Sequence, residues 1–330
     1  MKPTGRVLSG MRPTGALHLG HFHGVLSNWL KLQNEYDCFF FVADWHALTT
    51  DYANPAAIKD NIREMVIDWL SVGIDPAKAV IFRQSVIKEH AELHVLLSMI
   101  TPLSWLERNP TYKEQMEALV EKDVRTFGFL GYPVLQTADI IIYKASLVPV
   151  GVDQAPHLEL SREITRRFNH LYGNTFPEPQ TLLTTSPKVL GTDGRKMSKS
   201  YGNAILLSDA PEDVEKKMLQ MMTDTARKRR TDAGNPDVCP FYETFHALYS
   251  DETTVEWVRE GCAKASIGCT ECKRSVIPKV LAFLEPVQKR RAELEKDPTA
   301  IEAILRDGAR SAHEAASKTM HDARKAMGLE

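Results

Sequence analysis

The stretch Cys38-Phe39-Phe40-Phe41-Val42-Ala43 is apolar at every position. A strand with one face in water alternates polar and apolar residues, whereas a strand covered on both faces reads as a continuous apolar run. This stretch therefore indicates a buried strand of a parallel sheet. Two shorter segments on either side of it, Arg6–Ser9 and Ala79–Phe82, are also expected to be strands.

Helical patterns separate these strands. Leu19, Phe22, Leu26, Trp29 and Leu30 recur at helical spacing, and residues 56–72 form a second amphipathic pattern. Strands that alternate with helices predict an α/β fold with a parallel sheet and right-handed crossovers. Further along the chain the pattern predicts helices at 88–100, 113–122, 132–143 and 155–168 and a strand at 147–150.

The last third is expected to be almost entirely helical, which places a domain boundary near residue 205. One helix should begin near Pro211, because the fixed φ of proline suits a helix start. Another follows an apolar stripe from Ile301 to Ala323. The sequence shows no internal repeat and no low-complexity segment.

Composition sets the broad class. The 330 residues are 43% hydrophobic and 25% charged, with a net charge of −2, as in an ordinary soluble globular protein. The N-terminus lacks the apolar core of a signal peptide, and no apolar run is long enough to span a bilayer, so we expect a cytoplasmic protein. Two basic runs, Arg227–Arg230 and Lys289–Arg291, could contact nucleic acid, although solvated charged faces explain each run equally well.

Two nucleotide-binding patterns are missing from the sequence. No G-x-G-x-x-G follows the first strand, and no G-x-x-x-x-G-K-[ST] occurs. The first strand instead leads into Thr14-Gly15-Ala16-Leu17-His18-Leu19-Gly20-His21. The free N–H groups of a helix start favour a phosphate, glycines allow close approach, and both histidines can donate hydrogen bonds. Taken alone, the pattern is also that of a helix start with polar ends.

A second candidate phosphate site is Lys196-Met197-Ser198-Lys199-Ser200, which lies between Gly194 and Gly202. Lysines offer point charges and serines offer hydroxyls to a polyphosphate. An ordinary basic loop would explain this stretch if it stood alone.

Together, His18–His21 and Lys196–Ser200 resemble the HIGH and KMSKS signatures of class I aminoacyl-tRNA synthetases, the first with one aliphatic exchange. Between them, Gly151-Val152-Asp153-Gln154 resembles the G-x-D-Q of the tryptophanyl and tyrosyl subgroup. The resemblance covers essentially the whole chain. It implies a Rossmann-like α/β catalytic domain over residues 1–205, a helical anticodon-recognition domain over residues 206–330, and a homodimer.

The resemblance also implies the reaction: an amino-acid carboxylate attacks the α-phosphorus of ATP, pyrophosphate leaves, and the aminoacyl group then passes to tRNA. Such chemistry needs positioning and charge stabilisation more than acid–base groups. The implied catalytic residues are His18, His21, Lys196 and Lys199, with Mg²⁺ accompanying ATP. The implied ATP site comprises Arg12, Pro13, Thr14, Gly20, His21, Gly151, Val152, Asp153, Val189, Lys196, Met197, Ser198, Lys199 and Ser200.

The amino-acid pocket falls on one predicted helix. Tyr132, Gln136 and Asp139 share a face of it. By resemblance, Tyr132, Gln136 and Gln154 hold the α-amino group, and Asp139 reads the side chain. An unpaired buried carboxylate costs roughly 1–3 kcal/mol, so such a pocket rejects phenylalanine.

Asp139 can accept a hydrogen bond from an indole N–H or a phenol O–H, so this residue alone does not distinguish tryptophan from tyrosine as the substrate. Gln136 is familiar in tyrosyl enzymes, whereas many bacterial tryptophanyl enzymes carry Met there. Leu8, however, stands where tyrosyl enzymes commonly place a Tyr. The stretch Ala43–Thr49 resembles the tryptophanyl pattern and places His46 near the pocket, unless His46 is only a satisfied core histidine.

Four of the five cysteines, Cys239, Cys262, Cys269 and Cys272, follow the spacing C-x22-C-x6-C-x2-C. Four thiolates suit Zn²⁺ or an iron–sulfur cluster, and spacing alone favours zinc. A subset of bacterial tryptophanyl-tRNA synthetases carries this spacing around a [4Fe–4S] cluster, so the resemblance favours a structural cluster and tryptophan. Four unrelated buried thiols are the remaining explanation, and Cys38 is expected in the core.

These features lead us to expect a ligase that joins L-tryptophan to tRNA(Trp) with ATP. The alternatives are a tyrosyl-tRNA synthetase, a small-molecule nucleotidyltransferase, and a non-charging paralogue that binds tryptophan or RNA as a regulator.

Overall fold

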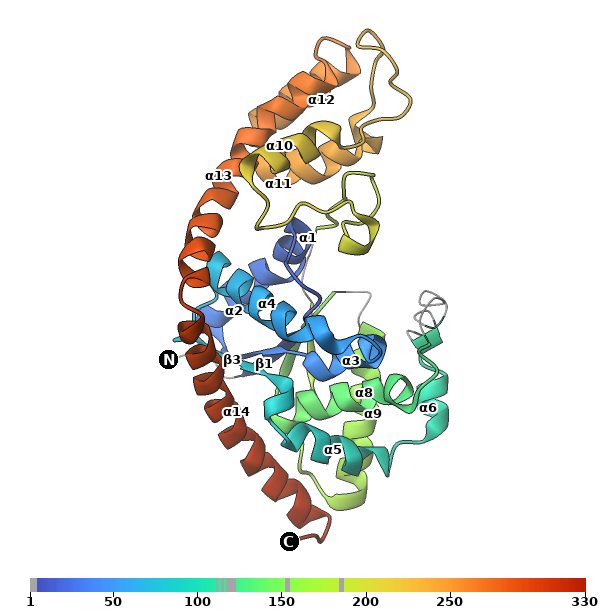
Figure 1. Ribbon diagram of the computed structural model, residues 1–330. Coiled ribbons are helices and arrows are strands. Elements are labelled where there is room, and N and C mark those ends of the chain that lie inside the picture. Colours follow the sequence, from blue (N-terminus) through green and yellow to red (C-terminus); the bar gives the residue numbers. More distant parts are fainter. Residues whose placement is uncertain (1–4, 111, 114–115, 117–122, 152–154, 184–186) are drawn as a thin grey trace.

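Five parallel strands form the sheet at the centre of the computed structural model (Figure 1). The structure describes residues 5–110, 112–113, 116, 123–151, 155–183 and 187–330. The spatial order of the strands is β3-β2-β1-β4-β5. Their bounds are β1 Arg6–Met11, β2 Asp37–Val42, β3 Ala79–Arg83, β4 Leu147–Val150 and β5 Gln180–Leu183. The predicted α/β class is confirmed, and β5 is the strand that the sequence did not predict.

The apolar run in β2 is explained by the two faces of the sheet. Cys38, Phe40 and Val42 belong to one buried cluster, and Phe39 and Phe41 belong to a second. Because alternate residues of a strand point to opposite faces, each cluster takes one set. The ring of Phe40 stacks on Trp29 of α2, with 4.2 Å between ring centroids.

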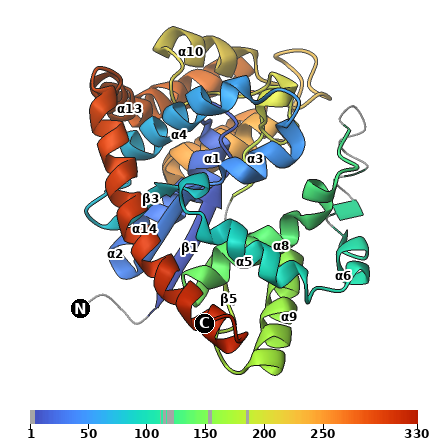
Figure 2. The ribbon, with the colours of Figure 1, turned by 60° about the horizontal axis from the view of Figure 1, so that its bottom comes forward.

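Helices cover both faces of the sheet. Helices α2 (Ser27–Glu35) and α4 (Ile58–Val72) supply the cluster that contains Phe40. Helices α5 (Glu89–Ser98), α8 (Phe127–Ile142) and α9 (Ala155–Tyr172) supply the other. Figure 2 shows α4 on one side of the strands and α5, α8 and α9 on the other.

The remaining elements of the first half are short. The segment α1 (Leu19–His21) continues through a π-helical turn (Phe22–Leu26) into α2, so the predicted helix is present but not uniform. Helix α3 spans Asp44–Asp51, and α6 spans Leu103–Glu107. Most of the helix predicted at 113–122 lies outside the described residues.

After residue 205 the named elements of the described chain are all helices, joined by turns and irregular segments, so the predicted helical C-terminal region is confirmed. Helix α10 begins at Pro211. The helices are α10 Pro211–Gln220, α11 Ala247–Tyr249, α12 Glu252–Ala263, α13 Cys269–Glu295 and α14 Pro298–Ala326. Among the described helices, none is both long and apolar enough to cross a membrane.

The two long C-terminal helices return to the sheet. Figure 1 shows α13 running along one side of the molecule and α14 continuing past β3. Helix α13 packs on α4, and α14 packs on β3, which is an edge strand. Gly308 of α14 faces the Ile81 backbone so closely that a Cβ there would lie 1.8 Å from the Ile81 carbonyl oxygen. The domain division at residue 205 remains a prediction.

Candidate active site

Two cavities meet at the carboxyl ends of the strands, which is where open parallel sheets bind ligands. The first, of about 380 Å³, lies over β1, β2 and β4 and reaches α8. The second, of about 500 Å³, lies between the loop after β1 and the Lys196–Ser200 segment. Arg12 lines both cavities, so the two spaces adjoin at its side chain.

The first cavity contains the predicted amino-acid pocket. Its volume lies within the range of roughly 300–1,000 Å³ that is typical of small-ligand sites. The predicted residues that line it are Leu8, His46, Tyr132, Gln136 and Asp139. Gln154 lies outside the described residues. Apolar walls, which include Phe41 and Val150, surround these few polar groups.

Asp139 is the electrostatic centre of this cavity. Its side chain is 1% exposed, and its carboxylate accepts from His46 Nε2 at 2.8 Å and from Gln84 Nε2 at 2.8 and 2.9 Å. His90 Nδ1 lies 2.6 Å from the other oxygen. Burial alone would raise the pKa of Asp139, but the hydrogen bonds from His46 and His90 outweigh it and lower the pKa to about 2.

The carboxylate is therefore a fixed negative charge that is already oriented by three side chains. His90 is fully buried, and its second nitrogen lies 2.6 Å from the hydroxyl of Tyr143. Since one ring joins Asp139 to Tyr143, the carboxylate cannot rotate without breaking a chain of buried hydrogen bonds. His46, at 13% exposed, is the member of this network that lines the cavity together with Asp139.

Gln84 and His90 were not identified from the sequence. Gln84 follows the last residue of β3, and the carboxyl ends of neighbouring parallel strands lie at one edge of a sheet. That rule applied to Ala79–Phe82 would have indicated Gln84. His90 carries no comparable signal, because its position depends on how α5 packs against α8.

The second cavity gathers the predicted phosphate-binding groups. Those that line it are Arg12, Pro13, Thr14, His18, His21, Ser198, Lys199 and Ser200. Asp51, Asn54 and Asn61 also line it, although the sequence motifs did not indicate them. Arg12 donates from Nη2 to Thr50 Oγ1 at 2.5 Å and lies 3.7 Å from Asp51. Burial lowers the pKa of Arg12, and the nearby Asp51 carboxylate opposes that shift.

The two signature histidines are neutral near pH 7. Burial, helped by Lys199, lowers the pKa of His18 to about 4. Burial, His18 and both signature lysines lower the pKa of His21 to about 3. The His18 backbone N–H donates to His21 Nδ1 at 3.2 Å, so the proton of the His21 ring is on Nε2. The buried Nδ1 of His18 has no hydrogen-bond partner within the described chain.

The Lys196–Ser200 segment is closed onto the first loop. Lys199 Nζ donates to the carbonyl oxygen of Thr14 at 2.5 Å. The buried side chain of Asn203 accepts from the Ser198 backbone N–H at 2.8 Å and donates to Asp193 at 2.7 Å. These bonds fix the backbone around Ser198, and burial lowers the pKa of Lys199.

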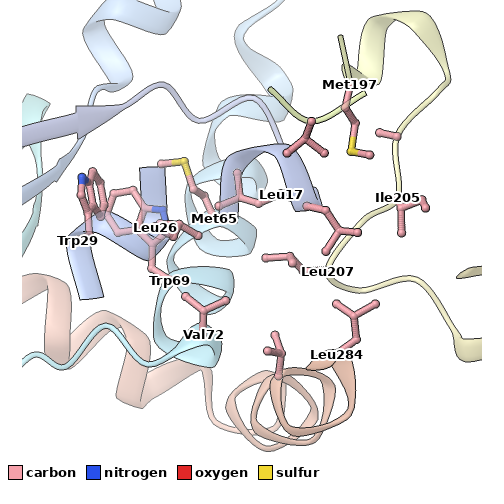
Figure 3. Close-up of a cluster of buried hydrophobic side chains, with 14 of the residues drawn as sticks. Leu17, Leu26, Trp29, Met65, Trp69, Val72, Met197, Ile205, Leu207 and Leu284 are labelled. Carbon is pink, nitrogen blue, oxygen red and sulfur yellow. The ribbon is translucent and has the colours of Figure 1, made fainter. Parts of the chain in front are cut away.

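Other residues of the predicted ATP site have different surroundings. Gly151 lines the first cavity, whereas Val152 and Asp153 lie outside the described residues. A Cβ on Gly20 would lie 2.9 Å from the His18 ring, which explains the glycine. Val189 and Met197 are buried in the hydrophobic core, where Figure 3 shows Met197 beside Ile205. Lys196 is exposed, and its positive charge acts on His21.

The four cysteines of the predicted metal site come together. Cys239, Cys262, Cys269 and Cys272 line one cavity, and all are free thiols. Burial first, and then the neighbouring cysteines, raise the pKa of Cys272 to about 12. Two polar side chains approach the sulfur atoms: His246 Nε2 lies 3.2 Å from Cys272 Sγ, and Arg227 Nη1 lies 3.7 Å from Cys262 Sγ.

The four side chains are all cysteines and line one cavity, which suits a group that is bound by thiolates. A single zinc ion, however, needs its sulfur ligands about 2.3 Å from one point. In the parts of the chain that the structure describes, no three His, Cys, Asp or Glu side chains are arranged to hold a metal ion. The predicted metal site is therefore not confirmed, although its four residues are neighbours.

Comparisons with known proteins agree with this geometry. The family model described as tRNA synthetases class I (W and Y) matches residues 2–285. The tryptophan–tRNA ligase of Thermotoga maritima is 53% identical and aligns with 98% of this chain and 99% of its own. The tryptophan–tRNA ligase of Aquifex aeolicus is 48% identical, with 98% and 100% covered. The structure of tryptophanyl-tRNA synthetase from Campylobacter jejuni, complexed with ADP and tryptophan, has a TM-score of 0.88 at 31% identity and covers 98% of this chain and 100% of that chain.

Proposed function

The chain belongs to the class I tRNA synthetases that comprise the tryptophan and tyrosine enzymes, and we propose that it is a tryptophan–tRNA ligase. It activates L-tryptophan with ATP to tryptophanyl-adenylate and pyrophosphate and then transfers tryptophan to tRNA(Trp), in the cytoplasm. One observation carries this proposal: an apolar cavity with an oriented, ionised Asp139 adjoins a cavity lined by both signature segments. The relatives named above are tryptophan enzymes, which favours the indole over the phenol.

The first step follows from the two cavities. Tryptophan occupies the apolar cavity, with its indole N–H directed to the Asp139–His46 pair and its amino group to Tyr132 and Gln136. Its carboxylate then points to the junction at Arg12, where the α-phosphate of ATP lies. The attack is a displacement between two held groups, so alignment supplies most of the rate.

The phosphate cavity supplies charge stabilisation. His18 and His21 act as neutral hydrogen-bond donors, because their lowered pKa values keep them unprotonated near pH 7. Lys199 exchanges its bond to the Thr14 carbonyl for the leaving pyrophosphate, and Lys196 adds a second charge from the surface. Mg²⁺ bound to ATP would neutralise part of the phosphate charge.

Amino-acid-dependent ATP–pyrophosphate exchange tests the proposal, with tryptophan and tyrosine offered separately. Exchange with tryptophan alone, followed by charging of tRNA(Trp), is the expected result. Exchange with tyrosine alone would make the enzyme tyrosine-specific. Exchange with neither would favour a regulator or another nucleotidyltransferase.

We further propose that Cys239, Cys262, Cys269 and Cys272 hold a structural [4Fe–4S] cluster. Support comes from the four free thiols that line one cavity and from their C-x22-C-x6-C-x2-C spacing. When bound, the group joins the start of α13 to α12 and to the loop that carries Cys239. The beginning of α13 and Arg227–Arg230 also line an open basic groove, which suits the phosphates of the tRNA anticodon arm.

Metal analysis tests the cluster. Protein purified without oxygen is expected to contain iron and sulfide rather than zinc, and Cys272→Ser is expected to lose the metal and to lower both the melting temperature and tRNA charging. Cys38→Ser is the control for metal content alone, because Cys38 is buried in β2 away from the cavity and should leave the bound iron unchanged. Loss of metal with unchanged folding and charging would refute a structural role.

We also propose a homodimer. Four apolar side chains on the adjoining helices α5, α6 and the start of α8 are strongly exposed in the single chain. They are Val95 at 49%, Met99 at 70%, Leu103 at 57% and Phe127 at 75% exposed. Exposed apolar side chains that gather on one face mark a protein interface, so we propose that these four contact a second copy of the chain.

A further inference from the structure

We propose that Asp68 and Arg291 are positioning residues for tryptophan activation, which hold the backbone at the entry to the His18–His21 segment against α13. The inference rests on the proposed function. It gives a role to Arg291, the last residue of a basic run that the sequence suggested for nucleic acid or for a solvated face. In the structure Arg291 points inward and is 7% exposed, so neither suggestion describes it.

The entry to the signature segment is held on one side by Asp68. The Leu17 backbone N–H donates to Asp68 Oδ2 at 2.7 Å, and Asp68 is fully buried in α4. Leu17 immediately precedes His18, the N-cap residue of α1. A shift of the Leu17 peptide therefore moves His18 and His21 together.

The other side is held by the strand-like segment that follows Lys196–Ser200. Leu207 N–H donates to the Leu17 carbonyl at 2.9 Å, and Leu19 N–H donates to the Ile205 carbonyl at 3.0 Å. Backbone bonds thus join the first signature segment to the chain that follows the second, and Asp68 holds Leu17 from the side of α4. Figure 3 shows the side chains of Leu17, Leu207 and Leu284 of α13 in the same hydrophobic cluster.

Arg291 orients the Asp68 carboxylate, which accepts the hydrogen bond from Leu17. Its Nη1 pairs with Asp68 Oδ1, its Nη2 with Glu64, and its Nε with Glu295 at 3.0 Å. The planar guanidinium engages three carboxylates at once, which a lysine ammonium cannot reproduce. Because Oδ1 is taken by Arg291, Oδ2 is directed to Leu17. The fork of Arg291 therefore sets the direction of the bond to the signature segment.

Asp68 also interacts electrostatically with a lysine of the second signature segment. The charge of Asp68 acts on Lys199, the lysine that closes onto Thr14. Asp68 lines neither cavity, so it touches no substrate and acts only through the backbone and the field. Changes at Asp68 or Arg291 should consequently alter the rate of activation and leave tryptophan binding intact.

The test compares Asp68→Asn, Arg291→Gln and Arg291→Lys with wild type. Each protein is assayed by active-site titration, by the single-turnover rate of adenylate formation per active site, and by the KM for tryptophan. We expect the rate per active site to fall roughly 10- to 100-fold in the first two variants, as misplacement of reacting groups does. The rate per active site of Arg291→Lys should lie between the rates of these two variants and that of wild type. The KM for tryptophan should change less than about twofold in all three variants, because the tryptophan cavity is untouched.

Arg63→Gln is the matched control, because Arg63 joins α4 to the Glu295 carbonyl of α13 at 3.3 Å but is exposed at the protein surface. It should keep the wild-type rate.

Fewer active sites with an unchanged rate per site would show that the buried ion pair only stabilises the fold and would overturn the inference. If Arg291→Gln does not fold, the same criterion applies to Arg291→Lys and Asp68→Asn. A wild-type enzyme that exchanges with neither amino acid would refute the proposed function as well, whereas active wild type with equally active variants would refute this inference alone.

Discussion

At the scale of single residues, the active site depends on how burial and hydrogen bonding compete for each titratable group. Burial opposes the charge on Asp139, yet hydrogen bonds and charge interactions with His46 and His90 lower its pKa and keep it ionised. At His18 and His21 burial acts in the same sense as the nearby lysines, and both rings stay neutral. The two adjoining cavities therefore combine an ionised carboxylate with neutral imidazoles, which suits the proposed binding of an indole and of phosphates.

Asp139→Asn should impair tryptophan recognition. The amide would place a donor among side chains that already donate, and one buried bond to the substrate would weaken. We expect kcat/KM for tryptophan in pyrophosphate exchange to fall roughly 5- to 150-fold, which corresponds to a loss of about 1–3 kcal/mol in transition-state stabilisation. Thr137→Val is the control, because Thr137 is a buried polar residue of α8 that bonds Ser161 at 3.0 Å and lies outside the cavity. Equal effects of both variants would argue against a direct role for Asp139.

The neutral state of His21 predicts a pH dependence of stability. In the unfolded chain its pKa is near 6.5, whereas the folded value is about 3. Below pH 6.5 the unfolded state binds the extra proton, so the free energy of unfolding falls as pH falls from about 6.5 toward 3. Urea unfolding at several pH values should show a shallower acid-side decline for His21→Asn than for wild type. Parallel curves would mean that the ring is already charged in the folded enzyme.

The sequence predicted the residues that form the two cavities better than it predicted their supports. His18, Lys199 and Asp139 belong to short motifs whose chemistry can be read locally. Gln84 and His90 act on Asp139 from 55 and 49 residues away in the sequence. His90 reaches Asp139 because α5 packs against α8, whereas Gln84 lies there because it follows the carboxyl end of β3. Periodicity carries no information about such long-range pairs.

At the scale of elements, the same distinction holds. The continuous apolar run of β2 was predicted because both of its faces are covered. The edge strand β5 was missed, because two of its four residues are exposed and the other two are only partly buried, so it gives no such run. The stripe from Ile301 to Ala323 predicted α14, but the surface that it covers depends on how the helix packs against β3.

Gly308→Ala should be strongly destabilising. The added Cβ would lie 1.8 Å from the Ile81 carbonyl oxygen, which belongs to rigid backbone. Separating α14 from β3 to relieve this clash should cost about 2–4 kcal/mol in the free energy of unfolding. Gly128→Ala in α8 is the control, because the nearest atom there is 4.0 Å away and the helix should gain up to about 1 kcal/mol. Chemical denaturation measures both, and similar values would contradict the contact.

At the scale of the whole molecule, the apolar patch on α5, α6 and α8 should set the oligomeric state. Replacing Met99 and Phe127 together by glutamate would place two charges in the proposed interface, and we expect sedimentation to show a shift from dimer to monomer. Leu171→Glu is the control, since Leu171 is 49% exposed on α9. A wild-type monomer at all concentrations, or a variant as dimeric as wild type, would refute the interface.

The contact between Gly308 and Ile81 also bears on synthesis of the chain. The free edge of β3 is complete once residue 83 has been made, but the helix that covers it begins at residue 298. During translation the strand therefore remains open while more than half of the polypeptide is still to be added. An uncovered edge can pair with another nascent chain. Fragments that stop before α14 should accordingly depend on chaperones and should aggregate when released from the ribosome.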